Sequence, residues 1–243
     1  MGTVDSRSPG SPALVSLSPL QQRVVSIVAS VPGAADLGLA GGAALLAWGV
    51  GERTTRDLDF FATRAETVDA FGPALERELR ARGLHVEAVR SSPGFVRYEI
   101  RDGDETTELD LAWDYRMRPL QRTSLGLTLD RDELAADKVL ALYGRAEARD
   151  FVDVFRLRAY YSRERLCDLA REKDHGFVEN MFADTLARME RRDRIEFDVD
   201  DATLDQLRRE FTDWRGELSR ATPDLEATPP TRDVEPPEID LGL

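Results

Sequence analysis

The most constraining feature of the chain is the stretch from residue 39 to residue 61, which reads LAGGAALLAWGVGERTTRDLDFF. A doubled glycine, Gly41 and Gly42, opens an apolar segment, and a short polar turn leads into a hydrophobic run that contains Asp57 and Asp59. In a strand, alternate side chains share a face, which places the two carboxylates on one side, about 6.5 to 7 Å apart. An interior strand tolerates two like charges only where a cation compensates them.

Two interpretations of this stretch are open. A bare pair of alternate aspartates is more often the wet face of an edge strand than a site. The upstream glycines shift the balance, because glycine permits close backbone approach and the N–H groups at a helix N-terminus favour an anion such as phosphate. A phosphate cradle beside paired carboxylates predicts a site for a metal ion and a nucleotide.

The flanking patterns alternate between helical and strand periods. Ser18-Pro19 is typical of a helix start, and apolar residues then recur at helical spacing as far as Pro32-Gly33. Asp102-Gly103 is typical of a hairpin. Further helices are expected over 42–48 and 66–82, and strands over 37–40, 57–61, 84–90, 95–101 and 105–113. The predicted fold is therefore α/β (α+β), with a small mixed β-sheet behind an N-terminal helix.

The returning strand of this hairpin offers a third carboxylate. Leu109 and Leu111 face one way there, and Asp110 faces the other. By itself Asp110 is more often an ordinary solvent-facing residue, but in the same sheet it can join Asp57 and Asp59. Three carboxylates suit two Mg²⁺ ions, which prefer hard oxygen ligands and keep phosphate oxygens in their shells. In phosphoryl transfer, such a site stabilises the attacking and leaving oxygens while Asp110 helps to activate the nucleophile.

From Thr128 onward the pattern becomes helical. Asp130 is a candidate N-cap for a strongly apolar helix over 134–143, and Lys138 lies on the stripe of that helix that should be buried. Either Lys138 snorkels to the surface, or it is a cation that faces a triphosphate. Later helices are expected over 163–173, 176–191 and 202–218.

The segment 145–157 places Asp150 and Asp153 on one helical face. Asp150 as a cap, with Asp153 paired to Arg149 or Arg156, is the structural alternative to a functional role. Positive charge is concentrated here, and it predicts a local basic face that a polyanionic acceptor would need. The arginines concerned are Arg145, Arg149, Arg156, Arg158, Arg163 and Arg165.

Composition limits the partners and the compartment. The formal net charge is −13 over 243 residues, so the chain as a whole should repel nucleic acid, and any RNA contact must use a local basic face. A single cysteine, the absence of a secretory signal and the absence of a long apolar run predict a soluble cytoplasmic protein without membrane contact. The expected organisation is a flexible N-terminus (1–17), a core (18–127), a helical domain (128–220) and a disordered acidic, proline-rich tail (221–243).

Taken together, these motifs resemble those of the AbiEii/AbiGii toxin nucleotidyltransferases. That family includes the MenT-type toxins and belongs to the DNA-polymerase-β-like superfamily. The resemblance covers roughly residues 37–160 and rests on GGAAL, RTTRDLDFF, LDL, DELAADKVLAL and RDFVDV in that order. It implies a nucleotidyltransferase core followed by a helical C-terminal region.

The resemblance also implies roles for individual residues. Gly41 and Gly42 are expected to hold nucleotide phosphates. Asp57, Asp59 and Asp110 are expected to bind Mg²⁺. Lys138 corresponds to the lysine of the family's third motif. The implied catalytic residues are Asp57, Asp59, Asp110, Lys138 and Asp150. The implied nucleotide-binding residues are Gly41, Gly42, Arg53, Thr55, Lys138 and Asp153.

The implied activity is Mg²⁺-dependent transfer of NMP from NTP to an acceptor hydroxyl, expected to be the 3′ end of tRNA. Such an enzyme acts as a toxin, and a cognate antitoxin is its expected partner. Two alternatives are open: a small-molecule (antibiotic-type) nucleotidyltransferase, and a catalytically weak nucleotide-binding component of a toxin–antitoxin system.

Overall fold

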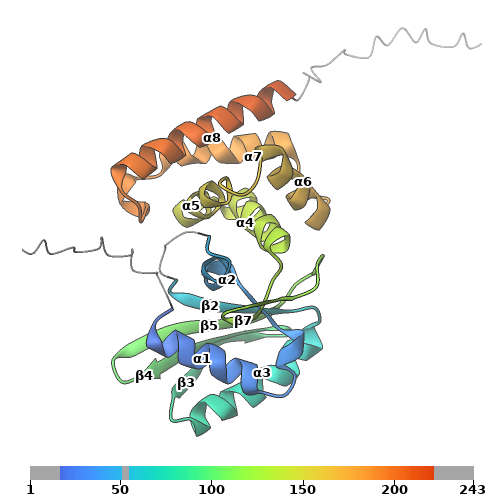
Figure 1. Cartoon of the computed structure of the whole chain (residues 1–243), viewed down its shortest axis with the longest axis vertical. Helices are drawn as coiled ribbons and strands as arrows, with labels where there is room; N and C mark the ends of the chain where they lie inside the picture. The colour runs from blue at the N-terminus through green and yellow to red at the C-terminus, as the bar shows by residue number, and fades with distance from the viewer. Residues whose placement is uncertain (1–16, 51–54, 222–243) are drawn as a thin grey trace, which may run out of the picture.

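The structure is a computed structural model that describes residues 17–50 and 55–221. Arg53, and all but one residue each of the expected N-terminal segment and acidic tail, lie outside the described residues. Within the described part, a sheet with its covering helices forms one layer of the molecule and a group of helices forms the other (Figure 1).

Seven strands form a single mixed sheet in the described part of the chain, in the order β3-β4-β5-β2-β1-β7-β6. β2 and β5 run parallel at its centre, and the other neighbours pair antiparallel except β1 with β7. The strands are β1 (Gly38–Ala40), β2 (Asp57–Ala62), β3 (His85–Ser92), β4 (Phe95–Asp102), β5 (Glu105–Trp113), β6 (Gln121–Thr123) and β7 (Gly126–Thr128). The predicted α/β architecture with a mixed sheet is confirmed.

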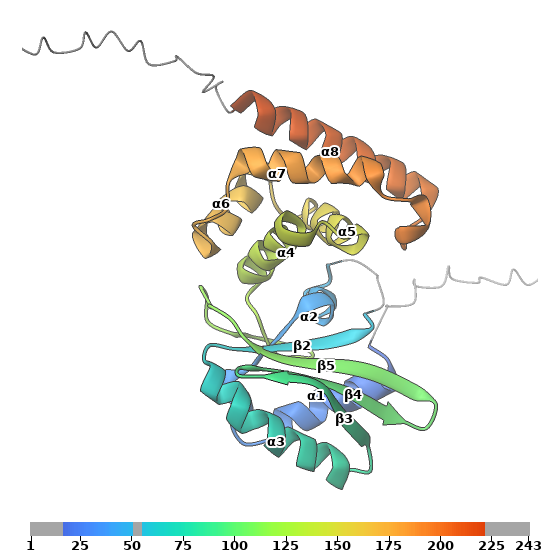
Figure 2. The ribbon, with the colours of Figure 1, turned by 180° about the vertical axis from the view of Figure 1, so that it is seen from behind.

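The two faces of the sheet are covered differently. Helices α1 (Pro19–Ser30) and α3 (Ala65–Ala81) pack on one face, and the short α2 (Gly41–Ala47) lies on the other (Figures 1 and 2). α1 begins as predicted, because the Ser18 hydroxyl accepts from the Gln21 N–H in a capping box. Leu58, Leu109 and other alternate strand residues are fully buried against α1 and α3, which leaves the opposite positions of β2 facing α2.

The helical part stacks beyond α2 (Figure 2). Its aromatic core includes Phe151, Phe182, Phe211 and Trp214, whose rings pack edge-on or stacked with centroids 5.1 to 6.0 Å apart. Its helices are α4 (Arg131–Arg145), α5 (Ala148–Leu157), α6 (Arg163–Lys173), α7 (Glu179–Leu186) and α8 (Asp201–Ala221), with the 3₁₀ turns η2 (Ala187–Arg191) and η3 (Arg194–Glu196). A further 3₁₀ turn, η1 (Ala34–Asp36), lies between α1 and β1. None of the helices in the described ranges is long and apolar enough to cross a bilayer.

A buried lysine joins the helical part to the sheet. Lys173, the last residue of α6, forms ion pairs with Asp137 and Glu133 on α4 and with Asp114 just after β5, the last two at 2.8 and 2.9 Å. Glu133 is fully buried and also accepts the backbone N–H of Met117 at 2.7 Å. One ammonium group therefore holds α6, α4 and the segment after β5 together.

The hairpin before α4 and the start of α7 differ from the sequence-based expectation. The β6–β7 hairpin was not predicted, because each strand has only three residues and neither shows an alternating pattern. The helix expected over 176–191 begins only at Glu179 and ends as a 3₁₀ turn. Its expected first residues form a turn, in which the Asp174 carboxylate accepts from the Gly176 N–H at 2.8 Å.

Candidate active site

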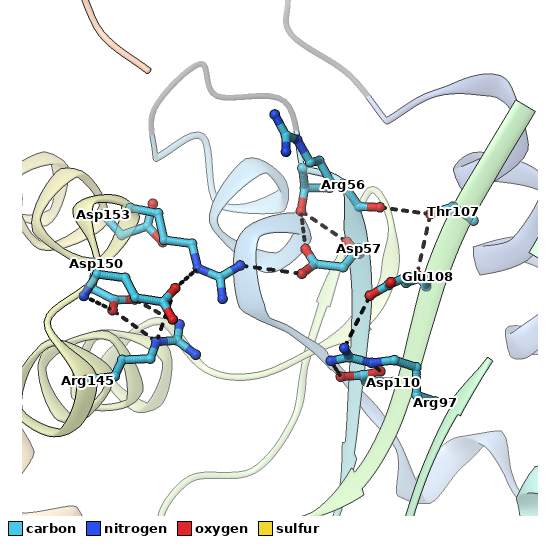
Figure 3. A network of polar contacts seen from close by, with 12 residues as sticks. Arg56, Asp57, Arg97, Thr107, Glu108, Asp110, Arg145, Asp150 and Asp153 are labelled. Carbon is cyan, nitrogen blue, oxygen red and sulfur yellow. Dashed lines mark hydrogen bonds and ion pairs between the residues drawn. The ribbon is translucent and has the colours of Figure 1, made fainter. Parts of the chain in front are cut away.

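A cleft of about 330 Å³ lies between the α2-bearing face of the sheet and helices α4 and α5. Figure 3 shows its two sides, with Asp57 and Asp110 on strands and Arg145, Asp150 and Asp153 on the facing helices. The cleft is lined by Gly41, Gly42, Asp57, Asp59, Phe61, Arg97, Asp110, Asp114, Leu134, Asp137, Lys138, Ala141, Arg145, Arg149 and Asp153. All three predicted metal-binding aspartates therefore line one cavity with Lys138.

The strand register explains why the aspartates converge. β2 alternates between half-buried and buried residues, so Asp57 and Asp59 share the face that the buried Leu58 does not. β2 pairs parallel to β5 with Asp59 directly beside Asp110. The prediction that Asp110 lies in the same sheet as Asp57 and Asp59 is confirmed. Its role in binding metal stays a prediction.

Asp57 is oriented by the residues that start its strand. The Thr55 hydroxyl lies 3.0 Å from Asp57 Oδ1 and can donate to it. The buried side chain of Gln21 on α1 in turn donates to the Thr55 carbonyl at 3.1 Å and to the Thr107 hydroxyl at 3.4 Å. Thr55 is thus placed to position a carboxylate, and direct contact with a nucleotide stays a prediction.

Gly41 makes room for Asp59. Its φ is +60°, and a Cβ at this position would lie 2.8 Å from Asp59 Cγ, inside van der Waals contact. The doubled glycine therefore does more than open α2, because a side chain at Gly41 would push the Asp59 carboxylate out of place. Phosphate binding by Gly41 and Gly42, which both line the cleft, stays a prediction.

We expect Gly41→Ala to lower the activity predicted from the sequence by about tenfold or more and to destabilise the fold by about 1 to 2 kcal/mol, because it combines left-handed strain with a clash. The matched control is Gly49→Ala just after α2. Gly49 has a similar φ of +69°, but a Cβ there meets nothing within 4 Å. Urea unfolding and kcat/KM are measured on both variants. Equal activity losses would show that backbone strain, and not displacement of Asp59, is responsible.

The opposite side of the cleft carries cations from α4 and α5. Lys138 Nζ lies 2.9 Å from Asp153 Oδ2, and both side chains are buried. Lys138 therefore does not snorkel, and its ammonium is held at the cleft wall by an acidic partner. Arg149 reaches across the cleft, 3.8 Å from Asp57 Oδ2, and also pairs with Glu147 at 2.8 Å.

Asp150 has a structural function in α5. Its carboxylate accepts the Glu147 N–H at 3.0 Å in a capping box. The structural alternative is therefore right that Asp150 takes part in the cap, but the N-cap residue itself is Glu147. It also accepts both Arg145 Nε and Nη2, at 3.0 and 2.8 Å. This hydrogen bonding is the main reason that the pKa of Arg145 is raised. A catalytic role for Asp150 stays a prediction, whereas its contacts fix Arg145 beside the cleft.

The electrostatics of the carboxylate side fit a divalent cation. Burial, followed by the charge of Asp57, raises the pKa of Asp59 from 3.8 to about 6. A cation beside Asp59 would favour its charged form, and carboxylate oxygens are the hard donors that Mg²⁺ prefers. Over the residues that the structure describes, no three His, Cys, Asp or Glu side chains converge into a metal-binding group. The fit therefore rests on Asp57 and Asp59, and Asp110 as third ligand stays a prediction.

Asp110 has a partner that the sequence reasoning missed. Arg97 on β4 donates through Nε and Nη2 to the two carboxylate oxygens, both at 2.7 Å. The sequence does contain a signal for this contact. Asp102 pairs with Glu105 around a two-residue turn, and the same strand register places Arg97 opposite Asp110. Asp114 and Asp137 were likewise not expected in the cleft.

Three of the arginines expected to contribute to a local basic face pair with acids on other helices. Arg158 and Arg163 both pair with Glu210 of α8 at 2.7 Å. Arg165 pairs with Asp132 of α4, also at 2.7 Å. These arginines tie helices together, whereas Arg145 and Arg149 are the members of the group that line the cleft.

The chain resembles known proteins in its sequence profile and in its fold. The profile of a family described as the nucleotidyl transferase AbiEii toxin of type IV toxin–antitoxin systems matches residues 26–236. MenT4, a nucleotidyltransferase toxin from Mycobacterium tuberculosis H37Rv, is 16% identical with a TM-score of 0.54, and the match covers 83% of this chain and 84% of that one. JHP933 from Helicobacter pylori is 20% identical with a TM-score of 0.51, over 85% of this chain and 96% of that one. No curated protein matches the chain.

Proposed function

This chain belongs to the AbiEii family of nucleotidyl transferase toxins, and we propose that its cleft transfers NMP from an NTP to a 3′ hydroxyl of tRNA. The observation that carries the proposal is that one side of the cleft is acidic and the opposite side is basic. Asp57 and Asp59 face Lys138 and Arg149 across one cavity, so a metal-bound triphosphate finds carboxylates on one side and cations on the other. Residues 18–127 would form the catalytic core and 128–220 a helical domain that supplies the cations.

Each wall has a distinct task in the proposed reaction. Asp57 and Asp59, with Asp110, would hold Mg²⁺, which when bound neutralises phosphate oxygens and favours loss of pyrophosphate. Lys138, Arg145 and Arg149 would bind the triphosphate, and this binding would place its α-phosphorus near the sheet. The acceptor oxygen then bonds to that phosphorus as the bond to the leaving pyrophosphate breaks, and Asp110 helps to remove the hydroxyl proton.

The nature of the acceptor has a second candidate. The pairing of Arg158, Arg163 and Arg165 with acids on other helices leaves a smaller basic surface than a long polyanion would use. A net charge of −13 points the same way. This observation favours a small-molecule hydroxyl, as in antibiotic-modifying enzymes on related folds. tRNA remains our first proposal, because the family consists of toxins.

The family description implies an antitoxin as the biological partner, because type IV systems pair a toxin with an antitoxin. We propose a cytoplasmic location, in which NTP, tRNA and the antitoxin are all present. A component that binds NTP without transferring it is the third possibility, and it predicts nucleotide binding in the absence of any labelled product.

The test is to incubate the full chain with Mg²⁺, each labelled NTP in turn, and either total tRNA or an aminoglycoside as the acceptor. We expect label in RNA with the wild type and none with Asp57→Ala/Asp59→Ala. The matched control is Asp205→Ala/Asp213→Ala, which removes two exposed acids from α8 and should keep full activity. Label on an aminoglycoside but not on tRNA would support the small-molecule candidate. Label that persists in Asp57→Ala/Asp59→Ala would refute the assigned site.

A further inference from the structure

Arg97 binds the carboxylate of Asp110, which the proposed function assigns as the third metal ligand. Its guanidinium contacts both oxygens of Asp110, so it neutralises that charge and engages a lone pair on each oxygen (Figure 3). The contact is strong because it is bidentate and charge-assisted, with both donor–acceptor distances at 2.7 Å. A divalent cation that approaches the same lone pairs of Asp110 therefore competes with the guanidinium.

A second acceptor lies within reach of Arg97. Glu108 Oε2 is 3.4 Å from Arg97 Nη1, and Glu108 lies two residues before Asp110 on the same face of β5. The Arg97 and Glu108 side chains are 38% and 47% exposed, whereas Asp110 is 12% exposed. Because the exposed pair lies at the edge of the cleft, the guanidinium can turn toward Glu108 without displacing core side chains.

We propose that Arg97 and a divalent cation compete for Asp110, and that Glu108 receives the guanidinium when the cation wins. Arg97 is then a positioning residue that sets how readily the metal site is completed. The proposal rests on the proposed function in one respect, because it takes Asp57, Asp59 and Asp110 as the metal ligands. A purely structural salt bridge and a competing one predict opposite changes in metal affinity when Arg97 is removed.

The affinity for Mn²⁺ shows in which direction the change goes. If Arg97 competes with the cation, Arg97→Ala should bind Mn²⁺ about tenfold more tightly than the wild type, because a bidentate charged contact is removed. If Arg97 only holds Asp110 in place, the same variant should bind Mn²⁺ more weakly. Glu108→Gln removes the second acceptor and should weaken binding about threefold or more, since each tenfold corresponds to about 1.4 kcal/mol.

The experiment titrates the full chain with Mn²⁺ and follows free Mn²⁺ by electron paramagnetic resonance. Arg101 and Glu99 provide matched controls, because they form an ion pair on the same face of β4 but lie outside the cleft. Arg101→Ala and Glu99→Gln change the net charge in the same way and should leave the affinity within about twofold. Arg97→Lys, which keeps the charge but loses the bidentate geometry, should fall between the wild type and Arg97→Ala.

The outcomes separate the two proposals. Mn²⁺ binding that is lost in Asp57→Asn/Asp59→Asn but unchanged or weaker in Arg97→Ala would overturn the competition and leave the proposed function standing. No binding by any variant would overturn both. Tighter binding in Arg97→Ala, matched by an intermediate Arg97→Lys, supports the competition, and Arg97→Lys decides the sign if circular dichroism shows that Arg97→Ala is unfolded.

Discussion

Asp59→Asn is expected to lower nucleotidyl transfer on the order of a thousandfold, because it removes a charge in the cleft that we propose binds the metal ion. The same substitution should not weaken the fold. Burial raises the pKa of Asp59 to about 6, so the charged form is unfavourable in the folded protein at neutral pH. A neutral amide of the same shape avoids that cost, and the melting temperature without divalent cations should rise by about 2–4 °C.

The sign of the pH dependence follows from the direction of the shift. A carboxyl whose folded pKa lies above its unfolded value destabilises the folded state as pH rises through that pKa. The advantage of Asp59→Asn over the wild type should therefore appear above about pH 6 and vanish near pH 4. Thermal melts in EDTA at both pH values measure it. Added Mg²⁺ should raise the melting temperature of the wild type alone, and an equal rise in the variant would show that Asp59 does not hold the cation.

The carboxylate side of the site could be predicted from local rules. Strand alternation fixes the shared face of Asp57 and Asp59, and the buried leucines of β5 fix the direction of Asp110. Even the contact of Arg97 with Asp110 follows from a tight hairpin, because a two-residue turn sets the register of the whole strand pair. The prediction of the hairpin at Asp102-Gly103 did not extend to the strand register, which alone places Arg97 opposite Asp110.

The cation side could not be predicted in the same way. Lys138 was correctly identified as a buried position, but its pairing with Asp153 depends on how α5 packs against α4. The arginines between 145 and 165 look equivalent in sequence. Tertiary packing divides them into cleft residues such as Arg145 and residues that join two helices, such as Arg163. The acids that pair with Arg158, Arg163 and Arg165 lie 33 to 52 residues away in sequence.

A second large effect concerns stability and the attachment of the helical part. Lys173→Met should destabilise the protein by about 3 to 5 kcal/mol, because removing the cation of a buried ion pair leaves uncompensated charge. The Lys173 side chain is 6% exposed and pairs with Glu133, which is fully buried, and with Asp137. These contacts hold α6 and α4 together behind the cleft, so nucleotide affinity should fall as well. Urea unfolding measures the change in the free energy of unfolding.

The pH dependence and a matched control separate this effect from the loss of an ordinary surface charge. Burial raises the pKa of Asp137 to about 6 even with Lys173 beside it, and without the ammonium it should rise further. Asp137 can then be protonated at pH 5 but not at pH 8, so the deficit of Lys173→Met should be smaller at pH 5. Arg171→Met on the same helix breaks only exposed pairs, with Asp168 and Glu179, and should cost no more than about 1 kcal/mol at either pH. Equal losses in the two variants would mean that the buried cluster adds nothing to the stability of the helical part, and that α6 is held to α4 by its apolar contacts alone.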